Sequence, residues 1–423
     1  AVTGVQTCAL PISPVHVLDS QLAVLELWHG PTAAFKDIAL QALPLLLTQA
    51  AHKLSVNHQM LILVATSGDT GKAALEGFKD VKGTRIVVYY PYQKVSKIQA
   101  LQMRTTEGSN THVIAIKGNF DDCQNAVKQI FADQFFSQTL KEKGYEFSSA
   151  NSINWGRLFP QIVYYFSAYL ELIKKNLIQL GEKINIVVPT GNFGNILAAW
   201  YACQMGLPVQ KLFCASNTNN VLTDFFHTGR YDRQRQLIST ISPSMDILIS
   251  SNLERFLFEI SQHQATHIIQ WMSELEQKGQ FSVHRELKQK MDNIIYAGYA
   301  SEKKTKETIK AVYDNYHYLV DPHTAVGFRV YQHYQQRHND KTVTLFDATA
   351  SPFKFNHSVL TALKGFASLQ YKDELDLLDQ LSKNTGAPIP LLLQDLKYKK
   401  IRHHLVYEKE GAQQSLKDIL NIN

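Results

Sequence analysis

The chain has 423 residues, of which 45% are hydrophobic and 19% are charged, and its formal net charge is +6. These values are ordinary for globular proteins and exclude a disordered, collagen-like or coiled-coil chain. The positive charge is spread along the sequence without a basic run, so we predict no nucleic-acid partner. The four cysteines have no CxxC spacing and no HExxH motif occurs, so we predict no metal site and no disulfide scaffold.

No segment is long and apolar enough to cross a bilayer, and we therefore predict no membrane partner and a cytoplasmic location. The first thirteen residues, AVTGVQTCALPIS, lack the pattern of a signal peptide. Residues 2–12 can be spelled by a common sequencing adapter. We expect residues 1–13 to be an artefact fused to a gene fragment, with the true N-terminus missing. A genuine N-terminal strand is the alternative.

Short runs rich in β-branched residues alternate with turns and helical stretches along the chain. Near-continuous apolar runs are typical of parallel strands that helices cover on both faces. This rhythm predicts an α/β architecture. Six strands are predicted: Leu61–Thr66, Arg85–Tyr90, Val113–Ile116, Ile184–Pro189, Leu212–Ser216 and Val343–Ala348.

Three other segments have distinct patterns. Ile38 to Ala51 has the length and apolar content of a buried core helix. Asn219 to Glu307 is richer in Gln, His and charge, and we expect a mostly helical elaboration there. The tail from Ala367 predicts two short helices broken at Gly386–Pro390.

Lys36 is the first candidate for chemistry. It precedes the predicted apolar helix in the segment HGPTAAFKDIALQ. Partial burial at that position lowers the pKa of an amine, which suits covalent chemistry with a carbonyl group. Taken alone, an exposed lysine in the first helical turn is the simpler interpretation.

Two turns that follow predicted strands are candidate anion sites. Ala65–Ala74 (ATSGDTGKAA) and Pro189–Asn195 (PTGNFGN) each open a helix, whose first N–H groups have no partner within the helix. The first departs from the Walker A pattern at Thr66 and Ala73, and the second lacks the GxGxxG spacing. We expect a carboxylate or phosphate at the first turn and a cofactor phosphate at the second. For both segments, a capped turn that binds no ligand is the alternative interpretation.

Two further segments carry polar groups at the start of a helix or the end of a strand. Asn151–Arg157 (NSINWGR) combines amides, a hydroxyl and a guanidinium group that can bind a phosphate or carboxylate in bidentate fashion. A capped helix with a surface arginine explains that segment equally well. Thr349 and Ser351 follow the last predicted strand, where ligands bind in open α/β sheets.

Taken together and in this order, the segments resemble threonine synthases, which are fold-type-II pyridoxal-phosphate (PLP) enzymes. The resemblance runs from about Val15 to Phe355 and is similar to the bacterial and fungal type, which has an additional segment before the HGPT motif. It rests on nine motifs: LELWHGPTAAFKD, ATSGDTGKAA, KVSKIQALQMRTT, FDDCQ, SSANSINWGRLFPQIVYYF, VPTGNFGNILAA, SPSMDILISSNLERF, DPHTAVG and FDATASPFKF.

The resemblance implies a fold like that of the tryptophan synthase β subunit, with two parallel-sheet α/β domains and the cofactor between them. Residues 14–60 and 150–423 would form a large PLP-binding domain, with the helical elaboration at about 219–307. Residues 61–149 would form the small domain. A monomer or a homodimer is expected.

The resemblance also implies roles for individual residues. Lys36 corresponds to the Schiff-base lysine. The implied cofactor contacts are Phe35, Lys36, Asp69, Gly191, Asn192, Phe193, Gly194, Asn195, Thr349 and Ser351. The implied substrate contacts are Ser67, Gly68, Thr70, Asn151, Ser152 and Arg157. Thr349 matches the hydroxyl beside the pyridine nitrogen, and Ser351 stands where the family usually has His, so Ser351 is an alternative partner for that nitrogen.

The activity implied is that of a carbon–oxygen lyase. It would convert O-phospho-L-homoserine and water to L-threonine and phosphate by γ-elimination and β-replacement. One alternative is a phospholyase that releases 2-oxobutyrate from the same substrate. Another is a non-catalytic relative that keeps the fold.

Overall fold

The computed structural model describes residues 12–365 and 373–422, so the expectation for residues 1–13 falls almost wholly outside the described residues. The chain divides into two compact units. Unit 1 comprises Ala1–His29 and Gln161–Tyr371, and unit 2 comprises Gly30–Pro160 and Lys372–Asn423. Helix α6 (Trp155–Lys174) begins in unit 2 and continues into unit 1.

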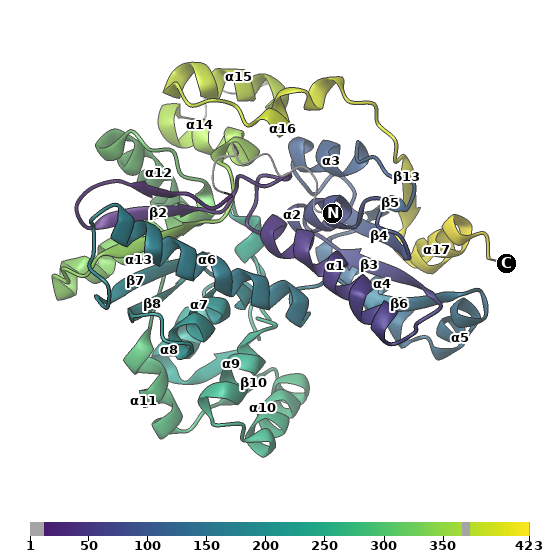
Figure 1. The fold of residues 1–423 in the computed structure, drawn as a ribbon, viewed down its shortest axis with the longest axis horizontal. Helices are drawn as coiled ribbons and strands as arrows, with labels where there is room; N and C mark the ends of the chain where they lie inside the picture. Colours follow the sequence, from purple (N-terminus) through teal and green to yellow (C-terminus); the bar gives the residue numbers. More distant parts are fainter. Residues whose placement is uncertain (1–11, 366–372, 423) are drawn as a thin grey trace. The chain divides into compact units, whose positions relative to one another are not determined.

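Unit 1 contains a six-stranded sheet with the strand order β1-β2-β12-β7-β8-β11 (Figure 1). All neighbouring strands are parallel except β1 and β2. Its elements are β1 (Val15–Val17), β2 (Leu22–Glu26), β7 (Ile184–Pro189), α7 (Gly194–Gln204), β8 (Val209–Ser216), α8 (Val221–Thr228), β9 (Arg230–Asp232), η1 (Pro243–Met245), α9 (Leu253–Ile260), α10 (Ala265–Lys278), β10 (Gln280–Ser282), α11 (Arg285–Ile294), β11 (Ile295–Tyr299), α12 (Glu302–Tyr316), α13 (Pro322–His338), β12 (Thr344–Ala348), η2 (Pro352–Phe355) and α14 (Asn356–Lys364).

Unit 2 contains a five-stranded parallel sheet with the order β13-β5-β4-β3-β6 (Figure 1). Strand β13 comes from the C-terminal tail and pairs with β5, which places the tail in this unit. Its elements are α1 (Lys36–Lys53), β3 (Gln59–Ala65), α2 (Asp69–Phe78), β4 (Thr84–Pro91), α3 (Lys97–Arg104), β5 (Thr111–Lys117), α4 (Phe120–Ala132), α5 (Gln134–Glu142), β6 (Tyr145–Ser149), α15 (Glu374–Thr385), α16 (Leu391–Gln394), η4 (Leu396–Tyr398), β13 (Leu405–Glu408), η5 (Lys409–Gly411) and α17 (Ala412–Leu420).

Alternate side chains of β3 divide the core of unit 2 into two layers. Ile62 and Val64 pack with residues of α1 and α2 on one face of the sheet. Leu61 and Leu63 pack with residues of α4, α5 and α17 on the other face. Because successive residues of a strand point to opposite faces, a continuous apolar run is needed to bury both. This is why every residue of the run LILVA is apolar.

The structure differs from the predicted organisation in several places. Residues 30–60, 150–160 and 373–422 group with unit 2, because α1 packs on α2, β6 pairs with β3 and β13 pairs with β5. The predicted buried helix at 38–51 lies within α1, but Leu45 and Leu46 are 64% and 43% exposed, so only one side of the helix is covered. The stretch 219–307 holds strands β9, β10 and β11 besides its helices.

Among the described residues, no helix combines the length and hydropathy needed to cross a membrane. The same part of the chain holds no group of three or more His, Cys, Asp or Glu side chains placed to bind a metal ion.

Candidate active site

A tight turn in unit 2 places Lys36 at the first residue of α1. The buried Asp37 carboxylate accepts hydrogen bonds from the backbone N–H of Thr32 at 2.8 Å and from its hydroxyl at 2.5 Å. A Cβ atom at Gly30 would lie 2.5 Å from the Cβ atom of Asp37, so only glycine allows this approach. The turn is fixed by these contacts, and it presents the Lys36 side chain at the start of the helix.

The Lys36 amine is mostly enclosed. Its side chain is 10% exposed, and Nζ lies 3.9 Å from Oδ2 of Asp69 and 4.7 Å from the centre of the Phe35 ring. Asp69 is 3% exposed and also accepts a hydrogen bond from Gln99 Nε2 at 3.0 Å. The structure therefore brings together three of the predicted site residues and adds Gln99 of α3, which the sequence reasoning did not select.

The loop Ser67–Thr70 connects β3 to α2. The hydroxyl of Thr66 accepts hydrogen bonds from the N–H groups of Gly68 and Gly71, which closes the turn. Gly68 has φ +135°, and a Cβ atom there would lie 2.5 Å from the Gln99 side chain. This position requires glycine for two reasons: its φ is positive, and there is no room for a side chain.

The residues of unit 2 that are predicted to bind a phosphate follow β6, the neighbour of β3 in the sheet. Arg157 is 4% exposed, and its Nη1 donates to the carbonyl of Ala150 at 3.0 Å. Burial lowers the pKa of Arg157 to about 10, so the side chain stays charged at neutral pH. Because β3 and β6 are parallel neighbours, the loops that carry Ser67–Thr70 and Asn151–Arg157 leave the same edge of the sheet.

The glycine-rich loop of unit 1 runs from the end of β7 to the start of α7. Phe193 adopts a left-handed conformation with φ 62° immediately before the helix. A Cβ atom on Gly191 would lie 2.6 Å from the carbonyl oxygen of Ser244, so the backbone needs glycine there. The hydroxyl of Ser250 donates to the Gly191 carbonyl at 2.8 Å, and Asn252 donates its backbone and side-chain N–H groups to the Asn192 carbonyl at 3.0 Å each.

These contacts orient the peptide planes of the loop. In a trans peptide the carbonyl and the following N–H point in opposite directions. Because the carbonyls of Gly191 and Asn192 face Ser250 and Asn252, the N–H groups of Asn192 and Phe193 point away from them. Successive N–H groups at the start of α7 form a cradle for an anion, and this observation fits the phosphate of PLP.

The side chain of Asn195 makes hydrogen bonds inside the protein. Its side chain is 6% exposed and belongs to a buried network with Tyr164, Tyr165 and Asp347. Asn195 Nδ2 donates to Asp347 Oδ2 at 3.1 Å, and the Tyr165 hydroxyl donates to the same oxygen at 2.6 Å. Its side chain thus ties α7 to β12 within the protein.

Thr349 and Ser351 follow β12, which is the parallel neighbour of β7. Their side chains and the glycine-rich loop therefore leave the same edge of the unit 1 sheet. Thr349 is 6% exposed, and Ser351 is fully buried and accepts a hydrogen bond from the Phe353 N–H at 3.3 Å. A serine hydroxyl that accepts one bond can still donate another, so Ser351 keeps a donor.

A histidine that the sequence reasoning did not select supports the loop from outside. The Ser244 N–H donates to His323 Nε2 at 3.2 Å, and His323 Nδ1 lies 2.5 Å from the Asp321 carboxylate. These bonds assign the proton of the ring to Nδ1. The motifs SPSMDILISSNLERF and DPHTAVG contain Ser244, Ser250, Asn252 and His323, and they were the signal that could have identified this support.

Comparisons with known proteins agree with this arrangement. Residues 11–347 match the family model for pyridoxal-phosphate dependent enzymes, and residues 324–391 match that for the threonine synthase C-terminal region. The human protein Threonine synthase-like 1 is 42% identical over 361 residues, which are 84% of this chain and 48% of that protein. The chain spans about half the length of such relatives.

Threonine synthase of Saccharomyces cerevisiae is 36% identical over 382 residues, covering 86% of this chain and 73% of the yeast protein. The crystal structure of PLP-bound threonine synthase from Brucella melitensis superposes with a TM-score of 0.83 at 36% identity, covering 97% of this chain and 80% of that one.

The two largely parallel α/β sheets and the matches to the family model and to the PLP-bound structure show that the chain has the fold of the fold-type-II PLP-dependent enzymes. Within that class, the chain belongs to the threonine synthase family. The α/β fold class, the family and the cofactor PLP predicted from the sequence are thereby confirmed.

Proposed function

We propose that the protein converts O-phospho-L-homoserine and water to L-threonine and phosphate. The observation that carries the proposal is the enclosed amine of Lys36, held at the start of α1 and 3.9 Å from Asp69. Bound PLP supplies an aldehyde that reacts with amines and a conjugated ring that accepts electron density from substrate carbon atoms. We further propose that Lys36 binds the aldehyde and that the loop 191–195 binds the phosphate of PLP.

Lys36 has two roles in this proposal. Lys36 would hold the cofactor, and with the substrate amine in its place Nζ would be free to take the proton from substrate Cα and then a proton from Cβ. Phosphate would leave from Cγ and water would add its oxygen at Cβ, and protons would return to Cγ and to Cα to give L-threonine. Asp69 lies close enough to hold the ammonium form of Lys36 between these transfers.

The remaining predicted residues bind and orient the two molecules. We assign the substrate carboxylate to the loop of Ser67, Gly68 and Thr70. We assign the substrate phosphate to Asn151, Ser152 and Arg157, because a buried guanidinium group stabilises the negative charge of a departing phosphate. Thr349 is assigned to the pyridine nitrogen, with Ser351 as its alternative.

Product analysis tests the proposed reaction. Holoenzyme is incubated with O-phospho-L-homoserine, and phosphate, L-threonine and 2-oxobutyrate are measured by chromatography. We expect L-threonine and phosphate in equal amounts. Release of 2-oxobutyrate with phosphate would instead show a phospholyase, and the absence of phosphate release from PLP-loaded protein would contradict both activities.

Replacing Arg157 by alanine tests the phosphate assignment. We expect KM for O-phospho-L-homoserine to rise by about 10- to 100-fold, because a charge-assisted hydrogen bond contributes about 1.5–3 kcal/mol. The effect on kcat should be smaller, and Arg157→Lys should recover part of the affinity because it keeps the charge. Steady-state kinetics provide the measurement, with circular dichroism to confirm that both variants fold. An unchanged KM in a folded Arg157→Ala variant would remove Arg157 from the substrate site.

A further inference from the structure

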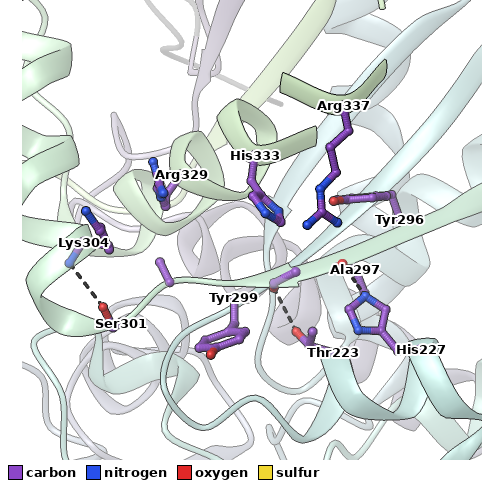
Figure 2. Close-up of a pocket in the computed structure, with 12 residues that line it drawn as sticks. Thr223, His227, Tyr296, Ala297, Tyr299, Ser301, Lys304, Arg329, His333 and Arg337 are labelled. Atoms are coloured by element: carbon purple, nitrogen blue, oxygen red, sulfur yellow. Dashed lines mark hydrogen bonds between the residues drawn. The ribbon is translucent and has the colours of Figure 1, made fainter. Parts of the chain in front are cut away.

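A cavity lies in unit 1, and it contains none of the residues assigned above to the cofactor or the substrate. Its volume is about 430 Å³, within the range of small-molecule pockets. The cavity is lined by the edge strand β11 and by residues of α8, α12 and α13 (Figure 2). No established or proposed step of the reaction uses it.

The lining is basic. Lys304, Arg329 and Arg337 contribute three cationic groups, and His227 and His333 contribute two imidazoles. None of the described lining residues has a carboxylate side chain. An excess of positive groups around a concave surface attracts anions and raises their local concentration.

Three basic side chains of α13 lie on one side of that helix. Arg329, His333 and Arg337 are spaced by four residues, which places them in a row over about 12 Å of helix. Figure 2 shows the Arg337 guanidinium group between His333 and Tyr296. Burial and the two neighbouring arginines lower the pKa of His333, which favours the neutral ring in this row.

The protein supplies little negative charge to balance this row. Glu307 forms an ion pair with Lys304 at 2.7 Å, and its pKa is lowered mainly by that hydrogen bond, with Arg329 adding a smaller effect. Within residues 12–365 and 373–422, neither Arg329 nor Arg337 has a carboxylate oxygen within 4.0 Å. A bound anion would balance the charges of Arg329 and Arg337, which lie on the same side of α13.

Side chains of α8 contact the backbone of β11 beside the cavity. The hydroxyl of Thr223 donates to the Gly298 carbonyl at 2.9 Å, and His227 Nε2 lies 3.0 Å from the Ala297 carbonyl (Figure 2). Ala300 donates its N–H to Ser216 of β8, so Gly298 faces β8 and Ala297 faces the open edge of the sheet. His227 thus occupies one carbonyl group that an added strand would need, which favours a small molecule over a peptide that extends the sheet.

Two tyrosines give the cavity flat apolar surfaces. Tyr296 packs at 4.8 Å from the ring of Tyr334, which fixes its orientation. Tyr299 is 54% exposed and offers an open ring at the rim. Aromatic rings of this kind stack with planar ligand groups.

We propose that this cavity binds a small anionic ligand that carries at least two phosphate groups and a planar ring, such as a nucleoside diphosphate. Arg329 and Arg337 bind the phosphate oxygens with their planar guanidinium groups, and Lys304, which is paired with Glu307, lines the cavity beside them. Tyr299 and Tyr296 provide the surface for the ring.

Isothermal titration calorimetry on the PLP-loaded full chain tests the proposal, with ADP, pyrophosphate and adenosine as the probes and no added metal. We expect saturable binding of ADP, about 10-fold weaker binding of pyrophosphate, and no measurable binding of adenosine. Pyrophosphate that binds as tightly as ADP would overturn the role of the ring. Absence of saturable ADP binding at about 1 mM would overturn the site.

Two variants locate the binding. Arg337→Gln and Arg329→Gln should each weaken ADP binding by about 10- to 100-fold. Arg285→Gln, an exposed arginine at the start of α11 outside the cavity, is the matched control and should bind ADP like the wild type. The absorbance of bound PLP should be unchanged in all three. Equal ADP affinity in the wild type and both cavity variants would contradict the proposal, as would a loss in Arg285→Gln of the same size.

Discussion

Replacing Lys36 by alanine is expected to abolish turnover, with kcat falling by at least about 10⁴-fold. The variant removes the only amine that the proposal uses, both to hold the cofactor and to move protons at substrate Cα and Cβ. The visible absorbance band of bound PLP should disappear with it. Steady-state kinetics and an absorbance spectrum with and without added PLP measure both effects.

A second buried lysine provides the control for this experiment. Lys72 is 8% exposed and donates to the Thr106 hydroxyl at 2.9 Å, and burial lowers the pKa of its amine. Lys72→Met should keep the absorbance band and most of the activity, because the proposal gives Lys72 no part in the reaction. Threonine production by Lys36→Ala, or loss of the PLP band in a folded Lys72→Met variant, would show that the wrong lysine has been assigned.

Replacing Asp347 by asparagine is expected to flatten the pH dependence of stability. Burial raises the pKa of Asp347 to about 7, although hydrogen bonds from Tyr165 and Asn195 oppose this effect. In an unfolded chain an aspartate titrates near about 3.9. Between these values the folded protein holds a proton that the unfolded chain has lost, so stability falls as the pH rises from about 4 to about 7.

The expected size of this effect is large. Ionisation of Asp347 in the folded state costs at most about 4 kcal/mol by about pH 8, at about 1.4 kcal/mol for each pKa unit. The asparagine side chain of the variant cannot ionise, so the stability of Asp347→Asn relative to the wild type should increase from about pH 5 to about pH 8. Urea unfolding of both proteins at a series of pH values measures the difference in unfolding free energy.

An exposed aspartate gives the matched control. Asp121 lies in the first turn of α4, where solvent screens its charge in the folded state as well as in the unfolded state. Asp121→Asn should therefore follow the pH profile of the wild type. A constant difference between Asp347→Asn and wild type at every pH would show that Asp347 has an ordinary pKa in the folded protein.

The sequence was sufficient for six of the buried strands, but β2 was missed although its Ala23, Val24 and Leu25 are fully buried. The six predicted runs correspond to strands β3, β4, β5, β7, β8 and β12, because continuous apolarity is the direct consequence of helices on both sides. Strands with mixed composition were missed. The half-exposed β6 (YEFSS) and the tail strand β13 (LVYE) do not carry that signal, and their pairing partners are distant in sequence.

The loops of the candidate site could be predicted from the sequence, but the residues that hold those loops in place could not. Glycines, hydroxyls and a lysine at strand and helix ends are local signals, and they selected Lys36, the loop at 67–70 and the loop at 191–195. The partners that hold these loops are set by tertiary packing. Gln99, Asn252 and His323 lie in motifs of the resemblance, but their contacts with these loops depend on tertiary packing, and so does the burial of Asn195 beside Asp347.

The central claim is that the cofactor is held by the amine at position 36. Borohydride reduction of the holoenzyme fixes PLP irreversibly to the amine that holds it, and digestion with mass spectrometry then locates the labelled peptide. The account predicts a single label on the peptide that contains Lys36. A label on Lys72 or any other lysine, with the Lys36 peptide unmodified, would contradict it.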